Sequence, residues 1–308
     1  MQIRRKKHNS EKNVRVEIRR DTMEINGYTR TCGLIGNPVE HTKSPAIHCF
    51  LASHTGQNLV YVPFHVEHGC LEDAVKGGFA LNLLGMNVTV PYKSDVIPYL
   101  DQVDELAARI GAVNTLVRTN MGFKGYNTDM PGLYRAMCSD GVSLEGEKVL
   151  ILGAGGVARA VAMLLATKNV KEIVLLNRTP ERAQNIADEI NGLEGREIAR
   201  AMKLEDYAKL PDERFLAIQA TNIGMFPKVE EVVLDDPAFY QKVHTGYDLI
   251  FNPMDTRFMQ LVRENGGRAF GGLKMLLYQG IIAYELWTGV AIDDKLANAT
   301  YEEIQRVV

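Results

Sequence analysis

Cysteine is scarce in this sequence, and the few cysteines are scattered. Cys32, Cys49, Cys70 and Cys138 are the four in the chain, and no two of them form a C-x-x-C pair. This spacing argues against a disulfide framework and against a cysteine-bound zinc site. No other cluster of histidine, cysteine and carboxylate residues has metal-ligand spacing, so we expect no metal. The four cysteines are expected to be small buried side chains in a protein of the reducing cytoplasm.

Long apolar runs and a strong net charge are also missing. No apolar run approaches the length of a membrane span, so we expect no membrane association. A net charge of −3 gives no whole-chain argument for binding nucleic acid or an anionic membrane. Basic residues do gather in the first 20 residues, but no apolar segment follows them, as a secretory signal would require. We expect a disordered tail at 1–23, or an extension upstream of a start at Met23; a basic arm that contacts nucleic acid is the alternative.

The overall composition is that of an ordinary globular protein. The chain has 308 residues, 46% of them hydrophobic and 24% charged, which suits two domains with ample core. Apolar runs alternate with helical patterns, which predicts an α/β fold with mostly parallel sheets. Strands are expected at 32–35, 60–66, 85–90, 112–118, 123–126, 149–152, 173–176, 215–219 and 246–251. Helices are expected at 45–55, 71–81, 103–110, 131–138 and 159–166, with a mainly helical segment from 271 onward.

A glycine-rich turn is the most informative motif. The apolar run at 149–152 leads into Gly153-Ala154-Gly155-Gly156-Val157, and an amphipathic stretch follows at 159–166. Strand, tight turn and helix in this order are the context of a dinucleotide fingerprint. The glycines let the backbone approach a pyrophosphate, and the helix N-terminus supplies N–H groups. An ordinary strand-to-helix turn without a ligand is the alternative.

The end of the following strand indicates which dinucleotide binds. The run at 173–176 is followed by Asn177-Arg178-Thr179, with Arg182 one helical turn later. An NAD site usually has an acidic side chain here, on the ribose 2′-hydroxyl. Guanidinium groups instead hold a 2′-phosphate through charge-assisted, often bidentate hydrogen bonds. The sequence therefore predicts NADP rather than NAD as the cofactor.

Two segments in the first half of the chain could form loops of a site. In 41–45, Ser44 and Pro45 are expected to be the N-cap and first residue of a helix, where hydroxyls could hold a substrate carboxylate. In 87–93, Asn87 and Thr89 share one face of a strand, and Lys93 lies just past its end. A simple helix cap and a solvated lysine are the structural alternatives.

Two more segments complete the set. In 127–129, directly before a helix, capping by Thr128 or Asp129 is one interpretation. The other pairs Asp129 with Lys93, because a carboxylate beside an ammonium orients it for general acid–base work. In 111–115, the amide of Asn114 could donate to and accept from a polyol hydroxyl.

Taken together and in this order, these segments resemble the shikimate/quinate dehydrogenase family. The resemblance runs from about residue 31 to the end of the chain and leaves only the basic tail uncovered. The matching segments are 36–38, 41–45, 87–93, 111–115, 127–129, 153–159, 177–179, 220–225, 247–253, 272–279 and 287–289.

The resemblance implies a two-domain architecture and a reaction. Residues 24–129 and 272–308 would form an N-terminal α/β substrate-binding catalytic domain, to which the C-terminal helices return. Residues 130–271 would form a Rossmann-type NADP-binding domain. The implied activity is the reversible NADPH-dependent reduction of 3-dehydroshikimate to shikimate, in the chorismate pathway to the aromatic amino acids. A small-molecule substrate is the expected partner, in a monomer or homodimer.

The resemblance also implies roles for individual residues. Lys93 and Asp129 match the catalytic pair of the family. The positions that match its substrate-binding residues are Thr42, Ser44, Asn87, Thr89, Asn114, Asp129, Phe251 and Gln279. The positions that match its NADP-binding residues are Gly153, Ala154, Gly155, Gly156, Val157, Asn177, Arg178, Thr179, Arg182, Thr221, Leu249, Gly272 and Met275.

Two positions depart from the pattern of the family. Thr42 stands where a serine is usual, so the hydroxyl is kept and a methyl is added. Phe251 stands where many members have tyrosine, and a partner left unpaired by the missing hydroxyl would cost about 1–3 kcal/mol. These departures leave a quinate/shikimate dehydrogenase of broader specificity open. A non-enzymatic dinucleotide-binding regulator is a further alternative, which the presence of both Lys93 and Asp129 disfavours.

Overall fold

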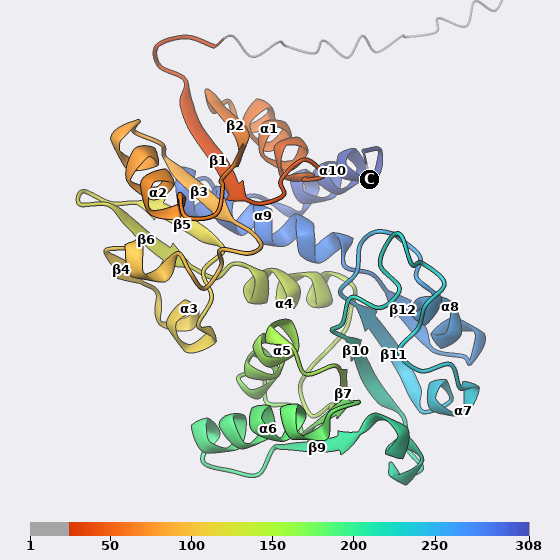
Figure 1. Ribbon diagram of the computed structural model, residues 1–308. Helices are drawn as coiled ribbons and strands as arrows, with labels where there is room; N and C mark the ends of the chain where they lie inside the picture. Colours follow the sequence, from red (N-terminus) through yellow and green to blue (C-terminus); the bar gives the residue numbers. More distant parts are fainter. Residues whose placement is uncertain (1–24, 308) are drawn as a thin grey trace, which may run out of the picture.

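Short apolar runs of the sequence become the strands of two sheets, and helices cover the faces of both (Figure 1). The computed structural model describes residues 25–307. The expected tail at 1–23 lies outside these residues. Strands such as Lys148–Leu152 are buried almost throughout, because helices pack on both sides of the sheet. The expected α/β class with two domains is confirmed.

The first sheet is mixed, with strand order β2-β1-β3-β5-β6-β4. Its strands are β1 (Arg30–Gly36), β2 (Leu59–His65), β3 (Gly85–Val88), β4 (Gln102–Val103), β5 (Thr115–Arg118) and β6 (Phe123–Tyr126). The connecting helices are α1 (Ser44–Thr55), α2 (Leu71–Ala80), the 3₁₀ turn η1 (Ile97–Tyr99) and α3 (Glu105–Ile110). β1 runs parallel to β2 and β3, whereas β5 is antiparallel to β3 and β6.

The second sheet is parallel throughout, in the order β12-β11-β10-β7-β8-β9. Its strands are β7 (Lys148–Leu152), β8 (Glu172–Asn177), β9 (Ala199–Lys203), β10 (Phe215–Gln219), β11 (Val243–Asp248) and β12 (Arg268–Phe270). Its helices are α5 (Gly156–Ala166), α6 (Pro180–Glu194), the 3₁₀ segment η2 (Leu204–Lys209), α7 (Pro237–Tyr240) and α8 (Arg257–Glu264). Counted from β7, this is the 3-2-1-4-5-6 order of a Rossmann fold, which binds ligands where the order reverses.

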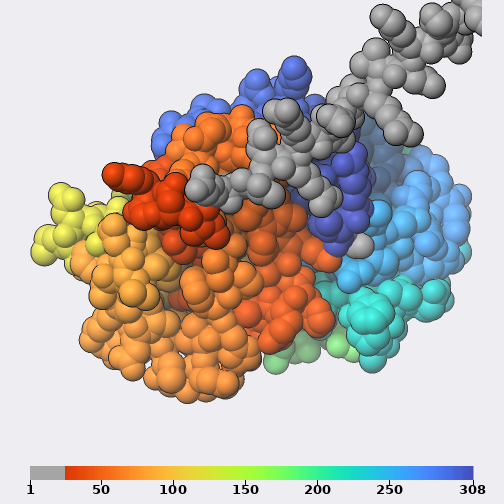
Figure 2. All heavy atoms as spheres, turned by 90° about the horizontal axis from the view of Figure 1, so that it is seen from above, coloured from red at the N-terminus to blue at the C-terminus, as the bar shows by residue number. Residues whose placement is uncertain are grey.

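Helices α4 (Asp129–Ser139) and α9 (Leu273–Thr288) cross between the two sheets (Figure 1). They pack closely because Gly132 of α4 has no side chain: a Cβ there would lie 2.6 Å from the backbone N of Gln279. After α9, helix α10 (Asp294–Gln305) packs against α1. Figure 2 shows the same adjacency from above, with the dark blue C-terminal residues beside the red and orange first domain. The C-terminal helices thus return to the first domain, as expected.

Three expected strands have different ends in the structure. The strand expected at 112–118 begins only at Thr115, and the helix expected at 103–110 begins at Glu105, after the unforeseen strand β4. The strand expected at 85–90 ends at Val88, because the chain turns there and the Tyr92 N–H donates to the Thr89 carbonyl. The strand expected at 246–251 is β11, which begins at Val243 beside Phe215 and leaves 249–251 in a loop. Helices α6 and α8 and strands β9 and β12 were not foreseen.

Two smaller expectations are wrong. Only Cys32 is buried, whereas Cys49, Cys70 and Cys138 are exposed. Ser44 is the first residue of α1 and not its N-cap: Lys43 holds that position, and no side chain caps the helix. Within residues 25–307, no helix is long and apolar enough to cross a membrane.

Candidate active site

A cavity of about 360 Å³ lies where the two domains meet. It is lined by the end of β3, the N-termini of α1 and α4, the loop after β11, and α9. Every residue predicted to bind substrate lies on its wall: Thr42, Ser44, Asn87, Thr89, Asn114, Asp129, Phe251 and Gln279, together with Lys93. The structure therefore brings together side chains that span residues 42 to 279 of the sequence.

Lys93 and Asp129 form an ion pair inside this cavity. The Lys93 Nζ donates to Asp129 Oδ2 at 2.6 Å, and the two side chains are 34% and 18% exposed. Tyr92 anchors the Lys93 loop, because its buried ring donates through the hydroxyl to the Val66 carbonyl at 2.8 Å. Asp129 is the first residue of α4, where the helix dipole favours a carboxylate. The ammonium is thus held in place and still open to the cavity.

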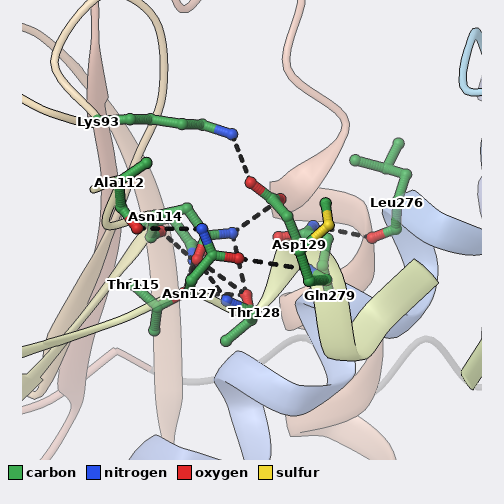
Figure 3. A network of polar contacts seen from close by, with 11 residues as sticks. Lys93, Ala112, Asn114, Thr115, Asn127, Thr128, Asp129, Leu276 and Gln279 are labelled. Carbon is green, nitrogen blue, oxygen red and sulfur yellow. Dashed lines mark hydrogen bonds and ion pairs between the residues drawn. The ribbon is translucent and has the colours of Figure 1, made fainter. Parts of the chain in front are cut away.

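Asn114 holds the other oxygen of Asp129 (Figure 3). Its Nδ2 donates to Asp129 Oδ1 at 2.9 Å, while its Oδ1 accepts from the Thr128 backbone N–H at 2.7 Å. The backbone N–H fixes the amide orientation, since it can only donate. Thr128 is the N-cap residue, yet its side chain does not cap α4. Capping by Thr128 or Asp129, the structural alternative, is therefore wrong.

Asn114 was predicted to bind a substrate hydroxyl, but its amide is already engaged within the protein. Asn87 is similar: its Oδ1 accepts from the Tyr61 hydroxyl at 2.7 Å, and its Nδ2 donates to Thr115 Oγ1 at 3.0 Å. Both amides are nearly fully buried. These two side chains line the cavity as parts of a fixed network, and their contact with a ligand stays a prediction.

The N-terminus of α1 contributes two hydroxyls to the cavity. Thr42 Oγ1 and Ser44 Oγ lie 3.2 Å apart, and the Ser44 backbone N–H donates to Thr42 Oγ1 at 3.2 Å. The positive end of the helix dipole and these hydroxyls form a suitable place for an anionic group. Gln279 of α9 lies beside Asp129, with its Nε2 donating to the Leu276 carbonyl at 2.8 Å (Figure 3).

The glycine-rich turn borders a second cavity of about 450 Å³. Gly153 adopts a φ of +115°, which L side chains rarely tolerate, and a Cβ there would lie 2.8 Å from Thr221 Cγ2. A Cβ at Gly155 or Gly156 would meet no protein atom within 4 Å, so both glycines face open space. Gly155 is the N-cap of α5 and has no capping side chain. The turn thus leaves room and N–H groups for a phosphate, which fits the predicted dinucleotide.

Arg178 and Arg182 line the same cavity. Arg159 and Arg200 nearby are paired with Glu189 and Glu172. Within the part of the chain that the structure describes, by contrast, Arg178 and Arg182 form no ion pair. Two guanidinium groups without carboxylate partners at the rim of a dinucleotide cavity fit a phosphate.

The other predicted cofactor residues divide between the two cavities. Gly153 to Val157, Asn177 and Thr221 line the cavity at the glycine turn. Thr179 does not line it: it is the N-cap of α6, and its carbonyl accepts from Asn177 Nδ2. Leu249, Gly272 and Met275 line the Lys93 cavity. Because β10 and β11 are neighbours in register, the loops after them begin side by side, and each lines one of the two cavities.

The buried carboxylate of Asp248, at the end of β11, holds the following loop through hydrogen bonds. Asp248 accepts from Thr256 Oγ1 at 2.6 Å, from the Ile250 N–H at 3.0 Å and from Gln219 Nε2 at 3.3 Å. Burial raises the pKa of Asp248 to about 6, against the opposing effect of these donors. Its place behind the loop makes its role structural.

Sequence reasoning missed part of each cavity wall. The missed residues of the Lys93 cavity are Leu34, Pro38, Val39, His41, Val88 and Leu276, together with Lys43. Those of the other cavity are Leu176, Leu204, Ala220, Asn222, Ile223, Val232 and Val233. Most are apolar and carry no chemical signal of their own. The polar exceptions, His41, Lys43 and Asn222, lie in the matching segments 41–45 and 220–225, which were the available signal for them. Among residues 25–307, no group of three or more metal-ligating side chains is arranged to hold a metal ion.

Three family models match the chain along its length. They describe a shikimate dehydrogenase substrate-binding domain at 34–116, a shikimate/quinate 5-dehydrogenase domain at 136–231 and a shikimate 5′-dehydrogenase C-terminal domain at 272–298. A shikimate dehydrogenase (NADP⁺) of Moorella thermoacetica is 43% identical over 280 residues, which cover 89% of this chain and 94% of that protein. The chain belongs to the shikimate dehydrogenase family.

Solved structures of this family share the fold. A crystal structure of a shikimate dehydrogenase in complex with NADP⁺ is 34% identical, covers 92% of this chain and 98% of that one, and has a TM-score of 0.84. The shikimate dehydrogenase of Thermus thermophilus, in complex with NADP(H) and shikimate, is 31% identical. It covers 91% of this chain and 100% of that one, with a TM-score of 0.80.

Proposed function

We propose that the protein catalyses the reversible NADPH-dependent reduction of 3-dehydroshikimate to shikimate. The Lys93–Asp129 pair is the observation that carries this proposal, since it lies in the cavity that holds every residue predicted to bind substrate. The curated relatives, which are named shikimate dehydrogenase (NADP⁺), support it. The step serves the chorismate pathway.

The substrate would lie between α1 and α9. Its carboxylate is placed at the N-terminus of α1, where Thr42 and Ser44 offer hydroxyls and the helix dipole offers positive potential. Its ring hydroxyls are placed toward Gln279, Asn114 and Asp129, which line the same cavity. Contacts on both sides of the ring fix its orientation, and fixed orientation lowers the entropic part of the barrier.

Lys93 is the proton donor in this proposal. When bound, NADPH supplies the hydride that reduces the carbonyl carbon. The Lys93 ammonium donates a hydrogen bond to the carbonyl oxygen and delivers its proton as that oxygen becomes a hydroxyl. In the reverse direction the neutral amine takes the hydroxyl proton. Asp129, clamped by Asn114 on its other oxygen, keeps the ammonium aimed at this position.

The second domain would hold the cofactor along the C-terminal ends of its strands. Gly153 to Val157 would take the pyrophosphate, and Arg178 and Arg182 the 2′-phosphate. Leu249, Gly272 and Met275 would contact the nicotinamide end, because they line the Lys93 cavity. On this basis we place the domain limits at 130–271 for the cofactor domain and at 24–129 with 272–308 for the catalytic domain.

The cellular setting and the assembly are part of the proposal. We propose a cytoplasmic enzyme, in which shikimate or 3-dehydroshikimate and NADP are the partners of the two cavities. A monomer or a homodimer is expected in solution, and light scattering on the purified protein distinguishes the two.

A spectrophotometric assay at 340 nm tests the function directly. Purified protein is offered shikimate or quinate, each with NADP or NAD. We expect fast turnover with shikimate and NADP. Replacing Lys93 by alanine should lower kcat by roughly 10²–10⁴-fold, the usual contribution of a positioned acid–base group, with the fold intact. Lys76→Ala is the matched control, since Lys76 is exposed on α2 and pairs with Glu72.

Each contrary outcome has its own meaning. Comparable turnover of quinate would make this a broader quinate/shikimate dehydrogenase, for which Thr42 and Phe251 would be the first residues to exchange. Faster turnover with NAD would refute the phosphate role of Arg178 and Arg182. Dinucleotide binding without turnover of either substrate would favour the regulator, and an unchanged kcat in Lys93→Ala would refute its catalytic role.

A further inference from the structure

A chain of buried hydrogen bonds runs beneath the Lys93 cavity. It starts at the Tyr61 hydroxyl of β2, which donates to Asn87 Oδ1 at 2.7 Å, and continues from Asn87 Nδ2 to Thr115 Oγ1 at 3.0 Å. Thr115 donates to Asn114 Oδ1 at 3.2 Å, and Asn114 Nδ2 donates to Asp129 Oδ1 at 2.9 Å. Tyr61 and Thr115 do not line the cavity, and they are 4% and 0% exposed.

Backbone groups fix the direction of this chain. The Asn114 carbonyl accepts from Asn87 Nδ2 at 3.2 Å, so the Asn87 Oδ1 must face Tyr61. The Thr128 N–H donates to Asn114 Oδ1, so the Asn114 Nδ2 must face Asp129. Each side chain in this series therefore donates a hydrogen bond to the next one toward Asp129, and the Asp129 carboxylate accepts the last of them.

The first link is itself held by packing. The His48 ring of α1 stacks on the Tyr61 ring with centroids 4.2 Å apart and planes inclined by 15°. His48 is fully buried, and Trp287 of α9 packs against its ring as well, at 5.0 Å between centroids. The phenol cannot turn away from Asn87 without breaking this stack.

We propose that Tyr61 and Thr115 are positioning residues, which act through Asn87 and Asn114 to hold Asp129, and hence Lys93, in the reactive geometry. This inference rests on the proposed function. Without the Tyr61 hydroxyl, Asn87 Oδ1 is buried and unpaired. Rotating the amide by 180° would bring that oxygen against the Asn114 carbonyl oxygen, so neither orientation is satisfied. The amide shifts, and the shift passes to Asn114 through Thr115.

Two variants break the chain and two matched variants leave it intact. Tyr61→Phe removes the first donor, and Thr115→Val removes the middle hydroxyl at nearly unchanged volume. Thr115→Ser keeps that hydroxyl. Tyr284→Phe removes a hydroxyl that hydrogen-bonds to Thr55 Oγ1. This hydroxyl belongs to a buried ring of the same domain but takes no part in the chain of hydrogen bonds. Testing two links keeps the proposal decidable even if one variant folds poorly.

Kinetics give the first readout. We expect kcat/KM for shikimate to fall at least tenfold in Tyr61→Phe and Thr115→Val, with the KM for NADP unchanged. Thr115→Ser and Tyr284→Phe should stay within twofold of the natural protein.

The side-chain amide signals give a readout that does not depend on turnover. In ¹H–¹⁵N spectra, the Asn87 and Asn114 amide signals should shift or broaden in Tyr61→Phe and Thr115→Val and stay in place in Tyr284→Phe. Equal kinetics and unchanged amide signals in all four variants would overturn the inference. Inactivity of the natural protein would instead overturn the proposed function, while the amide signals would still decide whether the chain of bonds is coupled.

Discussion

Two buried ionisable side chains respond to acid in opposite directions. Burial lowers the pKa of His48 to about 3, and within residues 25–307 neither of its ring nitrogens has a hydrogen-bond partner. Burial raises the pKa of Asp248 to about 6. The unfolded chain has ordinary values for both groups. Below its ordinary pKa of 6.5, His48 therefore binds its proton mainly in the unfolded state. Above its ordinary pKa of 3.8, Asp248 binds its proton mainly in the folded state.

Because the two effects have opposite signs, their contributions to the pH dependence of the free energy of unfolding should largely cancel in the natural protein. As pH falls from 6.5 toward 3, His48 lowers the free energy of unfolding by up to about 1.4 kcal/mol per pH unit. As pH rises from 3.8 through 6, Asp248 lowers it by a similar slope. Compared with the natural protein, the free energy of urea unfolding between pH 4 and 6 should therefore rise more steeply with pH in Asp248→Asn and fall with pH in His48→Phe. The same slope in both variants and the natural protein would contradict this account.

At the scale of elements, the crossing of α4 and α9 positions both sides of the cavity. Asp129 is the first residue of α4, and Gln279 lies on α9. The two helices approach so closely at Gly132 that an added Cβ would lie 2.8 Å from the Cα of Gln279. Backbone atoms cannot move aside as a flexible side chain can. The separation of the two helices therefore sets the distance between two walls of the site.

The close approach of α4 and α9 predicts that one methyl group added at Gly132 affects both stability and substrate binding. Gly132→Ala should destabilise the protein by about 1–3 kcal/mol, as overpacking does, and raise the KM for shikimate severalfold by displacing Gln279. Gly192→Ala is the control, since a Cβ at Gly192 in α6 meets nothing within 4 Å. It should stabilise by about 0.5–1 kcal/mol and leave kinetics unchanged. Thermal unfolding and steady-state kinetics compare the pair, and equal KM values in both variants would refute the positioning role of the crossing.

The sequence predicts an element well when its signal is local, and poorly when it depends on contacts with distant residues. The Gly153 turn and the Lys93 loop could be foreseen, because each follows a recognisable strand and carries residues with few structural uses. The end of β3 at Val88 could not, since the alternating pattern continues to Val90 and the strand ends in a turn in which the Tyr92 N–H donates to the Thr89 carbonyl. Tyr61 could not either: in the sequence it is one aromatic residue in an apolar strand, and its donor role depends on Asn87, which lies 26 residues away.

At the scale of the whole molecule, one hydrophobic core joins the two domains. Buried side chains in continuous contact run from Leu34 of β1 through Leu133 of α4 and Leu277 of α9 to Ile151 of β7. Two further clusters are confined to one domain each. Domains that share a core of this kind depend on each other for burial, although their sheets are separate.

The shared core predicts cooperative unfolding. Trp287, the only tryptophan of the chain, donates through Nε1 to the Leu116 carbonyl and reports on the first domain. Far-ultraviolet circular dichroism reports on both domains. We expect the two signals to follow the same urea transition, because neither sheet can lose α4 and α9 alone. Two separated midpoints would show that the domains unfold independently.

The return of α9 to the first domain has a consequence for synthesis on the ribosome. Every strand of the first sheet is translated before residue 127, yet Gln279, Met275 and Trp287 arrive only with the last part of the chain. Strands β7 to β12 emerge in between, since they are continuous in sequence, but the core that they share with the first domain also waits for α9. The nascent first domain must wait with an uncovered apolar face until α9 leaves the exit tunnel. A chain released before α9 is made would therefore contain the glycine turn but lack the cavity wall formed by Met275 and Gln279.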